Sequence, residues 1–271
     1  MPHDSNAMKL AFAGKGGVGK TTIAAWMADY LARAGHNVWL VDADTALSLG
    51  VASGLAPEQL PVPLVQRRDL FESYVGSGII KLSPDVSGLS GSLAVDLPES
   101  EAPLLEGVSE RGNKRLLVMG SISSAGGGCA CEANALLKAM LAHLIYDEDG
   151  YVLVDLEAGV EHLGRGTVAN VDHLIIVSEP SLRSLETAST IAKLADELGL
   201  HDQTLVMNRF EDDEITLPDG LDLPASRFSV KGLSGLHERM LSDGSVLDLP
   251  EQDYIDEQLA QLLAEMGEAK Q

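Results

Sequence analysis

The fold of this chain is decided by the stretch Gly14-Lys15-Gly16-Gly17-Val18-Gly19-Lys20-Thr21-Thr22. An apolar run at residues 9–13 precedes it, and apolar residues at helical spacing follow it over residues 23–34. A run that ends in glycines is typical of a buried parallel strand. With a further apolar run at residues 38–41, these pieces predict a strand–helix–strand unit whose first turn is rich in glycine.

The same alternation returns later in the chain. Apolar patterns predict strands at residues 116–119, 151–154, 174–177 and 204–207, and helices at residues 133–146, 182–198 and 254–268. Between them, the proline-rich residues 45–113 are expected to form an irregular insertion, with a short helix near 69–75 and an edge strand near 79–82. Residues 1–7 are expected to be a disordered lead or a cloning remnant. Residues 8–271 then form one α/β domain, a doubly wound, mostly parallel sheet with helices on both faces.

The glycine-rich turn is suited to binding phosphate. Glycines let successive backbone amides point inward at an anion, and the following helix adds the positive end of its dipole. Lys20 can reach the β- and γ-phosphates of a nucleotide, and the Thr21 hydroxyl can bind Mg²⁺. A plain glycine turn does not require all of these residues in register, so the pattern predicts an ATP site.

Polar side chains follow three of the predicted strands. Asp42 and Asp44 follow the second, Asp155 follows residues 151–154, and Asn208-Arg209 follows residues 204–207. Doubly wound sheets bind ligands at these carboxyl ends. Asp155 alone fits a helix cap as well as a Mg²⁺ ligand, and its pairing with the loop favours the ligand. The Asn208 amide can pair with a base edge or form a turn.

Lys15 is a lysine that an ordinary phosphate loop does not need. Lys-Gly-Gly-Val-Gly-Lys-Thr-Thr resembles the deviant P-loop of the MinD, ParA, ArsA and NifH group. The resemblance implies a P-loop ATPase whose dimer forms around ATP, with Lys15 crossing to the partner's nucleotide. Asp44 then positions the attacking water, Asp42 lies near the metal or the loop lysine, and Asp155 holds Mg²⁺ with Thr21. Further implied contacts are Gly159 with the γ-phosphate and Asn208-Arg209 with adenine.

Cys129 and Cys131 are the two cysteines of the chain, too few for a disulfide framework, and this favours the reducing cytoplasm. Two thiols beside the start of a predicted helix make a soft site for Ni²⁺, Zn²⁺ or Cu⁺. A four-sulfur site needs a second copy of the pair, which a two-fold dimer would supply. Two buried small residues, or a redox pair, remain alternatives.

Two longer motifs extend the resemblance. Gly-Cys-Ala-Cys-Glu-Ala-Asn-Ala-Leu-Leu at residues 128–137 and Asp-Leu-Glu-Ala-Gly-Val-Glu-His-Leu-Gly-Arg-Gly-Thr at residues 155–167 resemble the CooC family. That resemblance implies an ATPase that helps nickel enter carbon monoxide dehydrogenase, its client, with Ni²⁺ or Zn²⁺ held by Cys129 and Cys131 across the homodimer. Glu161-His162 also fits the family, and His162 could assist a metal, although an exposed or capping histidine is the simpler interpretation. Glu132 replaces the proline of the usual pattern, which puts the rigidity of the cysteine loop in doubt.

Charge bears on the competing functions. The formal net charge is −22, from 41 acidic and 19 basic residues, and the basic pairs Arg67-Arg68 and Lys114-Arg115 are expected to be solvated. Nucleic acid and anionic membranes are therefore poor partners, which disfavours a MinD- or ParA-type positioning ATPase. A NifH-like iron–sulfur reductase component also fits two sulfurs per chain, but such proteins space their ligand cysteines far apart.

Overall fold

The computed structural model describes residues 8–44, 46–67, 94–120, 150–157, 171–211, 217–242 and 244–268. Several of the elements predicted from sequence lie outside these ranges. They are residues 1–7, the short helix near 69–75, the edge strand near 79–82 and the helix at 133–146.

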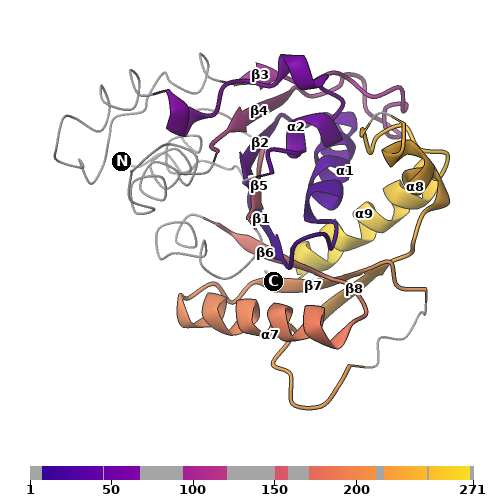
Figure 1. The fold of residues 1–271 in the computed structure, drawn as a ribbon. Coiled ribbons are helices and arrows are strands. Elements are labelled where there is room, and N and C mark those ends of the chain that lie inside the picture. The colour runs from indigo at the N-terminus through magenta and orange to yellow at the C-terminus, as the bar shows by residue number, and fades with distance from the viewer. Residues whose placement is uncertain are drawn as a thin grey trace, which may run out of the picture.

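The described elements build one eight-stranded sheet with the order β3-β4-β2-β5-β1-β6-β7-β8. Every neighbouring pair is parallel except β3 and β4. The strands are β1 Met8–Gly14, β2 Val38–Ala43, β3 Val95–Asp96, β4 Lys114–Val118, β5 Tyr151–Leu156, β6 His173–Ser178, β7 Gln203–Asn208 and β8 Ser226–Val230. The predicted doubly wound, mostly parallel sheet is confirmed, and β1 lies at its centre (Figure 1).

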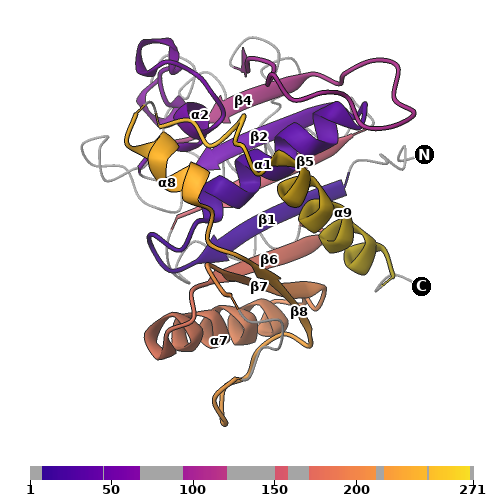
Figure 2. The ribbon, with the colours of Figure 1, turned by 90° about the vertical axis from the view of Figure 1, so that its right-hand side faces the viewer.

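Helices cover both faces of the sheet. On one face lie α1 Lys20–Arg33 and α9 Gln252–Glu268, and on the other lies α7 Leu182–Glu197 (Figures 1 and 2). Because successive side chains of β1 point to opposite faces, Leu10 and Phe12 pack in the core beneath α1 and α9, whereas Ala11 and Ala13 join the core beneath α7. Both layers of the predicted architecture are therefore present around a single central sheet.

The apolar side of α9 packs in the hydrophobic core. Leu259, Leu262 and Met266 are buried in the same core cluster as α1, and Leu263 packs against that cluster. The helix predicted at residues 254–268 is therefore present and packs on the core. In the part of the chain that the structure describes, none of the helices combines the length and apolarity that crossing a bilayer requires.

Several described elements have no counterpart in the sequence prediction. They are β3, β8, α8 Ser234–Met240 and the short helices within residues 45–113. In β8, Ser-Arg-Phe-Ser-Val places only Phe228 and Val230 in the core, which is a weak apolar signal for an edge strand. The described part of residues 45–113 holds β3 and short helices, namely α2 Leu49–Ala52 and the 3₁₀ helices Pro57–Gln59 and Leu64–Gln66.

Lys114 corrects the expectation that the pair Lys114-Arg115 is solvated. Its side chain is buried, and its Nζ lies 2.8 Å from Oδ1 of Asp29 in α1. Burial by itself raises the pKa of Asp29, but Lys114 foremost, with Arg33 and Ser100, outweighs it and holds that pKa below its usual value. A two-residue basic pair gives no hint of this because the partner carboxylate lies 85 positions away.

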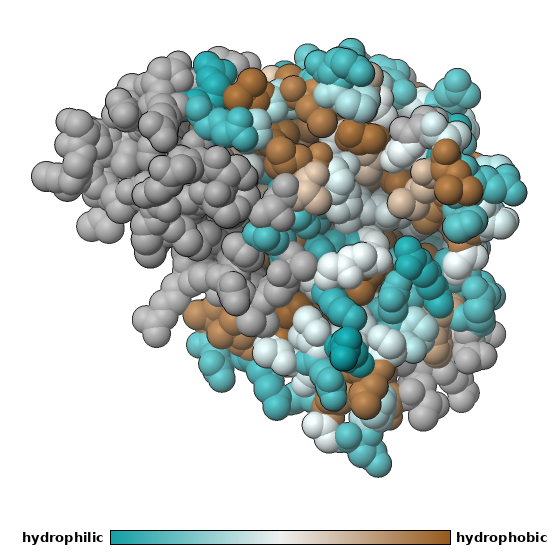
Figure 3. Space-filling view, in the orientation of Figure 1, coloured by the Kyte–Doolittle hydropathy of each residue, from teal (hydrophilic) through white to brown (hydrophobic). Residues whose placement is uncertain are grey.

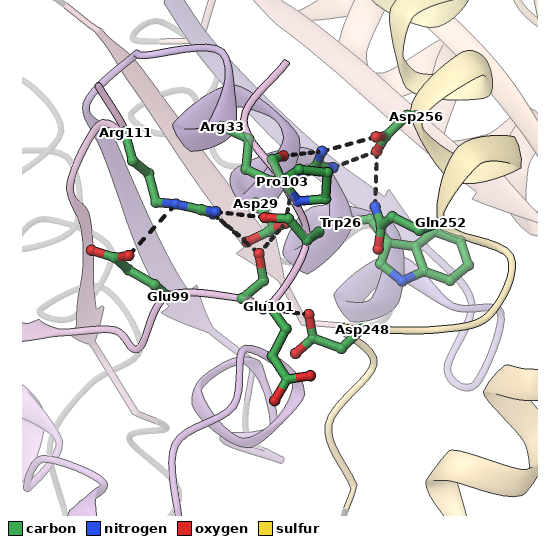
Figure 4. Close-up of polar contacts among 12 residues, drawn as sticks. Trp26, Asp29, Arg33, Glu99, Glu101, Pro103, Arg111, Asp248, Gln252 and Asp256 are labelled. Atoms are coloured by element: carbon green, nitrogen blue, oxygen red, sulfur yellow. Dashed lines mark hydrogen bonds and ion pairs between the residues drawn. The ribbon is translucent and has the colours of Figure 1, made fainter. Parts of the chain in front are cut away.

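Arg33 extends the same cluster to the C-terminal helix. Its Nε donates to Asp29 at 2.9 Å, its Nη1 donates to Asp256 of α9 at 2.8 Å, and its Nη2 also contacts Asp256 (Figure 4). The carbonyl of Pro103 accepts a further hydrogen bond at 3.2 Å. Asp29, Arg33, Lys114 and Asp256, which we call the charge cluster, therefore join α1, α9 and β4.

Candidate nucleotide site

The glycine-rich turn connects β1 directly to α1, and two of its glycines are required by close approach. Gly14 has φ 149°, and a Cβ there would lie 2.2 Å from the carbonyl oxygen of Val177 in β6. Gly19 has φ 100°, and its Cβ would lie 2.3 Å from Nδ2 of Asn208. Any larger residue would strain the turn, so the glycines fix how tightly it packs on the neighbouring strands.

The turn ends where α1 begins, at Lys20. Ile23 N donates to Gly19 O at 3.0 Å, which closes the first helical turn and leaves the earlier amides to face an incoming anion. Lys20 is 5% exposed, whereas Gly16 and Gly17 are exposed and Lys15 is partly exposed. The structure therefore brings together a helix N-terminus, a cradle of glycines and two lysines.

Asp42 and Asp155 stand opposite one another on the adjacent strands β2 and β5. Both are 0% exposed. Burial, reinforced by the charge of Asp155, raises the pKa of Asp42 to about 7. Burial likewise raises the pKa of Asp155 to about 6, although the Thr21 hydroxyl and Lys20 favour its ionised form. Two neighbouring carboxylates with raised pKa values mark a place where a cation stabilises the ionised pair.

The donor set at Asp155 fits Mg²⁺. Thr21 Oγ1 donates to Asp155 Oδ2 at 2.6 Å, so the hydroxyl and the carboxylate already lie side by side. The other oxygen, Oδ1, is buried and has no hydrogen-bond partner among the described residues. Mg²⁺ prefers oxygen ligands and commonly binds through one or two carboxylates together with substrate phosphates. An unpaired buried carboxylate oxygen beside the phosphate loop matches that need.

Asp42 has a different local role from Asp155. Its Oδ1 accepts from the backbone N of Asp44 at 3.2 Å, and its Oδ2 accepts from Leu49 N, at the start of α2, at 3.0 Å. Asp42 therefore shapes the chain that leaves β2. Asp44 lies in that segment, partly exposed, and its Oδ1 accepts from Ala46 N at 2.9 Å. Whether Asp42 contacts metal, and whether Asp44 orients water, stay predictions.

Asn208 holds the phosphate loop. Its side chain is 5% exposed, its Nδ2 donates to Val18 O at 2.7 Å, and its Oδ1 accepts from Arg209 N at 3.0 Å. Arg209 has φ 57°, and its guanidinium contacts the Glu179 carboxylate beyond the end of β6. The sequence pointed to Asn208 and Arg209 as adenine contacts. Glu179 was missed, since an acid after a strand gives no signal of its partner.

Several predicted site residues lie outside the described residues. They are Gly159, the cysteines Cys129 and Cys131 with their neighbour Glu132, and the pair Glu161-His162. Their roles rest on the sequence.

Comparison with known proteins, like the geometry, indicates a nucleotide-binding domain. Residues 10–228 match the family model of the CobQ/CobB/MinD/ParA nucleotide binding domain. The chain is 38% identical over 213 residues to an uncharacterised ATP-binding protein of Methanocaldococcus jannaschii, covering 76% of this chain and 77% of the relative. It is also 38% identical over 200 residues to the carbon monoxide dehydrogenase accessory protein CooC of Rhodospirillum rubrum, covering 71% of each.

Among solved structures, the fold is similar to the septum site-determining protein MinD of Pyrococcus horikoshii, complexed with Mg-ADP. The TM-score is 0.64 at 16% sequence identity, over 98% of this chain and 99% of that one. At this identity the likeness concerns the fold.

Proposed function

We propose, from the premise that the chain belongs to the CobQ/CobB/MinD/ParA nucleotide-binding family, that it is an ATP-hydrolysing switch that dimerises around its nucleotides. The observation that carries the proposal is the junction of Thr21 and Asp155 beside the phosphate loop, with one buried carboxylate oxygen unpaired. A bound Mg²⁺–nucleotide would supply the partner that this carboxylate oxygen lacks, whereas a purely structural turn does not require such an oxygen.

The residues divide the work of phosphoryl transfer between them. Backbone amides of the loop and the Lys20 ammonium bind the phosphates, and Asn208 keeps the loop in place through Val18. Thr21 and Asp155 would hold Mg²⁺, which, when bound, offsets charge on the phosphate oxygens. Asp44 orients the water, and Lys15 of one protomer stabilises the transition state on the nucleotide of its partner.

The test compares Lys15→Ala with Lys20→Ala. Lys20→Ala should abolish tight ATP binding, because it removes the cation nearest the phosphates. Lys15→Ala should still bind ATP but lose hydrolysis by about 10²–10³-fold, the usual effect of removing one transition-state donor. Binding is measured with a fluorescent ATP analogue and turnover by phosphate release. If Lys15→Ala hydrolyses ATP normally, the trans role of that lysine is wrong.

We further propose that the dimer binds Ni²⁺ or Zn²⁺ through Cys129 and Cys131, and delivers nickel during maturation of carbon monoxide dehydrogenase. The likeness to CooC supports this proposal, together with the Cys-x-Cys spacing. Four thiolates from two chains form a closed tetrahedral site for a soft metal. Equilibrium dialysis of each metal against the protein and Cys129→Ala/Cys131→Ala tests it. Equal binding by the two proteins would contradict it.

A further inference from the structure

A hollow of about 390 Å³ lies between the end of α2 and the chain that follows α8, away from the phosphate loop residues. Three separate stretches line it, drawn from residues 51–57, 98–99 and 239–248. Figure 2 shows α2 and α8 on the same side of the molecule, toward the carboxyl ends of the strands. None of the lining residues belongs to the nucleotide site described above.

Half of the residues that line the hollow are apolar, and one of the others carries a buried hydroxyl. Its apolar members are Val51, Leu55, Ala56, Pro57, Pro98 and Leu247. Ser53 also lines it and is 2% exposed, and within the described part of the chain its buried Oγ has no hydrogen-bond partner. A buried hydroxyl without a partner is uncommon, since buried polar groups are nearly always hydrogen-bonded. The apolar side chains that line the hollow suit an apolar group of a ligand.

The rim of the hollow is acidic. Glu99 and Asp248 are lining residues, and the Glu99 side chain is 78% exposed. Two more carboxylates directly adjoin lining residues in the sequence: Glu58 and Glu238. Glu99 lies 3.7 Å from Nε of Arg111, and Asp248 Oδ1 accepts from the backbone N of Glu101 at 2.7 Å. Among the described lining residues, Arg239 is the one cation. The local excess of negative charge favours a cationic ligand, and the whole chain carries a net charge of −22.

The same place also carries exposed apolar side chains. Met240 and Leu241, directly after the lining residue Arg239, are 55% and 80% exposed. Of the described residues, only Val62 and Leu182 are comparably exposed among large hydrophobic ones. Figure 3 shows apolar and polar side chains interspersed over the region of α8. Exposed apolar groups rimmed by polar ones are typical of a protein-binding surface.

We propose that this hollow, with Met240 and Leu241 at its edge, docks a segment of a partner protein that carries apolar side chains flanked by lysine or arginine. The apolar side chains enter the hollow, and the flanking cations meet Glu99 and Asp248. The partner is identified by this chemistry, and the docking does not depend on the proposed nucleotide chemistry.

The test uses a fluorescein-labelled peptide, Lys-Arg-Leu-Leu-Arg-Lys, and its acidic counterpart Glu-Asp-Leu-Leu-Asp-Glu. Fluorescence anisotropy should show that the full chain binds the basic peptide only, and less tightly at about 0.5 M than at about 0.05 M salt, because exposed charges are screened. The double variant Glu99→Lys/Leu241→Ser, and Ser53→Leu, which fills the hollow, should each weaken binding by about tenfold or more.

The matched control is Glu186→Lys, a similar charge change at an exposed position of α7. It should bind the basic peptide as the unchanged chain does, and thermal melts should confirm that each variant is folded. Equal weakening by Glu186→Lys would mean attraction to the acidic surface in general and would overturn the proposal. A change in self-association caused by Leu241→Ser would instead assign the surface to a second copy of the chain, and would also overturn it.

Discussion

Buried carboxylates lie near both ends of α1, and their pKa values are shifted in opposite directions at the two ends. At the C-terminal end, Asp29 is surrounded by Arg33, Lys114 and Ser100, and its pKa is lowered. At the N-terminal end, Asp42 and Asp155 face each other, and their pKa values are raised to about 7 and about 6. The protein supplies the cations that neutralise Asp29, whereas Asp42 and Asp155 together need a further cation, which a ligand would bring. This difference separates a structural cluster from a binding site.

The largest expected effect comes from breaking the complete cluster. Asp29→Ala leaves Arg33 and Lys114 buried without their shared carboxylate, and removing one partner of a buried pair typically costs about 3–5 kcal/mol of unfolding free energy. Urea denaturation followed by circular dichroism measures it. Asp253→Ala, at an exposed position in the first turn of α9, is the control and should change little. Equal stability of the two variants would show that the charge cluster is dispensable.

The second-largest effect is expected at Asp155, which faces Asp42, and it concerns ATP hydrolysis. Asp155→Asn keeps the size of the side chain and its contact with Thr21 but removes a buried charge. We expect ATP hydrolysis to fall by about 10²–10³-fold. The nucleotide-free protein should be as stable as the original or more stable, because an uncompensated carboxylate is gone. A large loss of stability would place Asp155 with Asp29 as a structural residue.

The pH dependence of stability should differ in sign between the two regions. Asp42 and Asp155 hold their protons in the folded protein up to about pH 7 and 6, whereas the unfolded chain ionises near pH 4. Their contribution to stability is therefore present in acid and is lost as pH rises from about 4 to 7. Asp29, whose pKa is lowered, contributes above its unfolded pKa and loses that contribution as pH falls.

Unfolding free energies of the nucleotide-free protein at several pH values, for the original chain, Asp155→Asn and Asp29→Asn, distinguish these contributions. Asp155→Asn should flatten the decline between about pH 4 and 7, by an amount on the order of 2–3 kcal/mol. Asp29→Asn should flatten the loss on the acid side instead. Parallel profiles for all three proteins would contradict the assignment.

The smallest effect is expected at an exposed ion pair. Lys193 Nζ lies 3.9 Å from Asp222 Oδ2, and both side chains are more than half exposed. Solvent screens such pairs, so Lys193→Ala should change the unfolding free energy by no more than about 0.5 kcal/mol. A larger change in urea denaturation would mean that burial does not explain the contrast between the buried regions and the surface.

The residues of the nucleotide site could be predicted from the sequence more readily than those of the charge cluster. The loop from Gly14 to Thr22 is contiguous, and Asp42, Asp155 and Asn208 each follow an apolar strand, so parallel-strand topology predicts that they meet at one edge of the sheet. The Thr21–Asp155 contact follows from the same topology.

The charge cluster left no comparable signal. Asp29 and Arg33 lie four residues apart in α1 and would suit an exposed helix face equally well. Only the packing of α9 and β4 against that face buries them, and Lys114 looked like half of a surface pair for the same reason. Likewise, the Glu179–Arg209 contact forms because the ends of β6 and β7 lie side by side, and neither residue type predicts it.

The charge cluster also bears on when the chain can finish folding during its synthesis. Arg33 is made 223 residues before its partner Asp256. Both neighbours of the central strand, β5 and β6, likewise follow β1 by well over a hundred positions. A ribosome-bound chain therefore carries α1 with Arg33 paired only to Asp29 until residue 256 has emerged. Such late closure of long-range contacts slows folding, and it makes the docking of α9 against α1 a late step of folding.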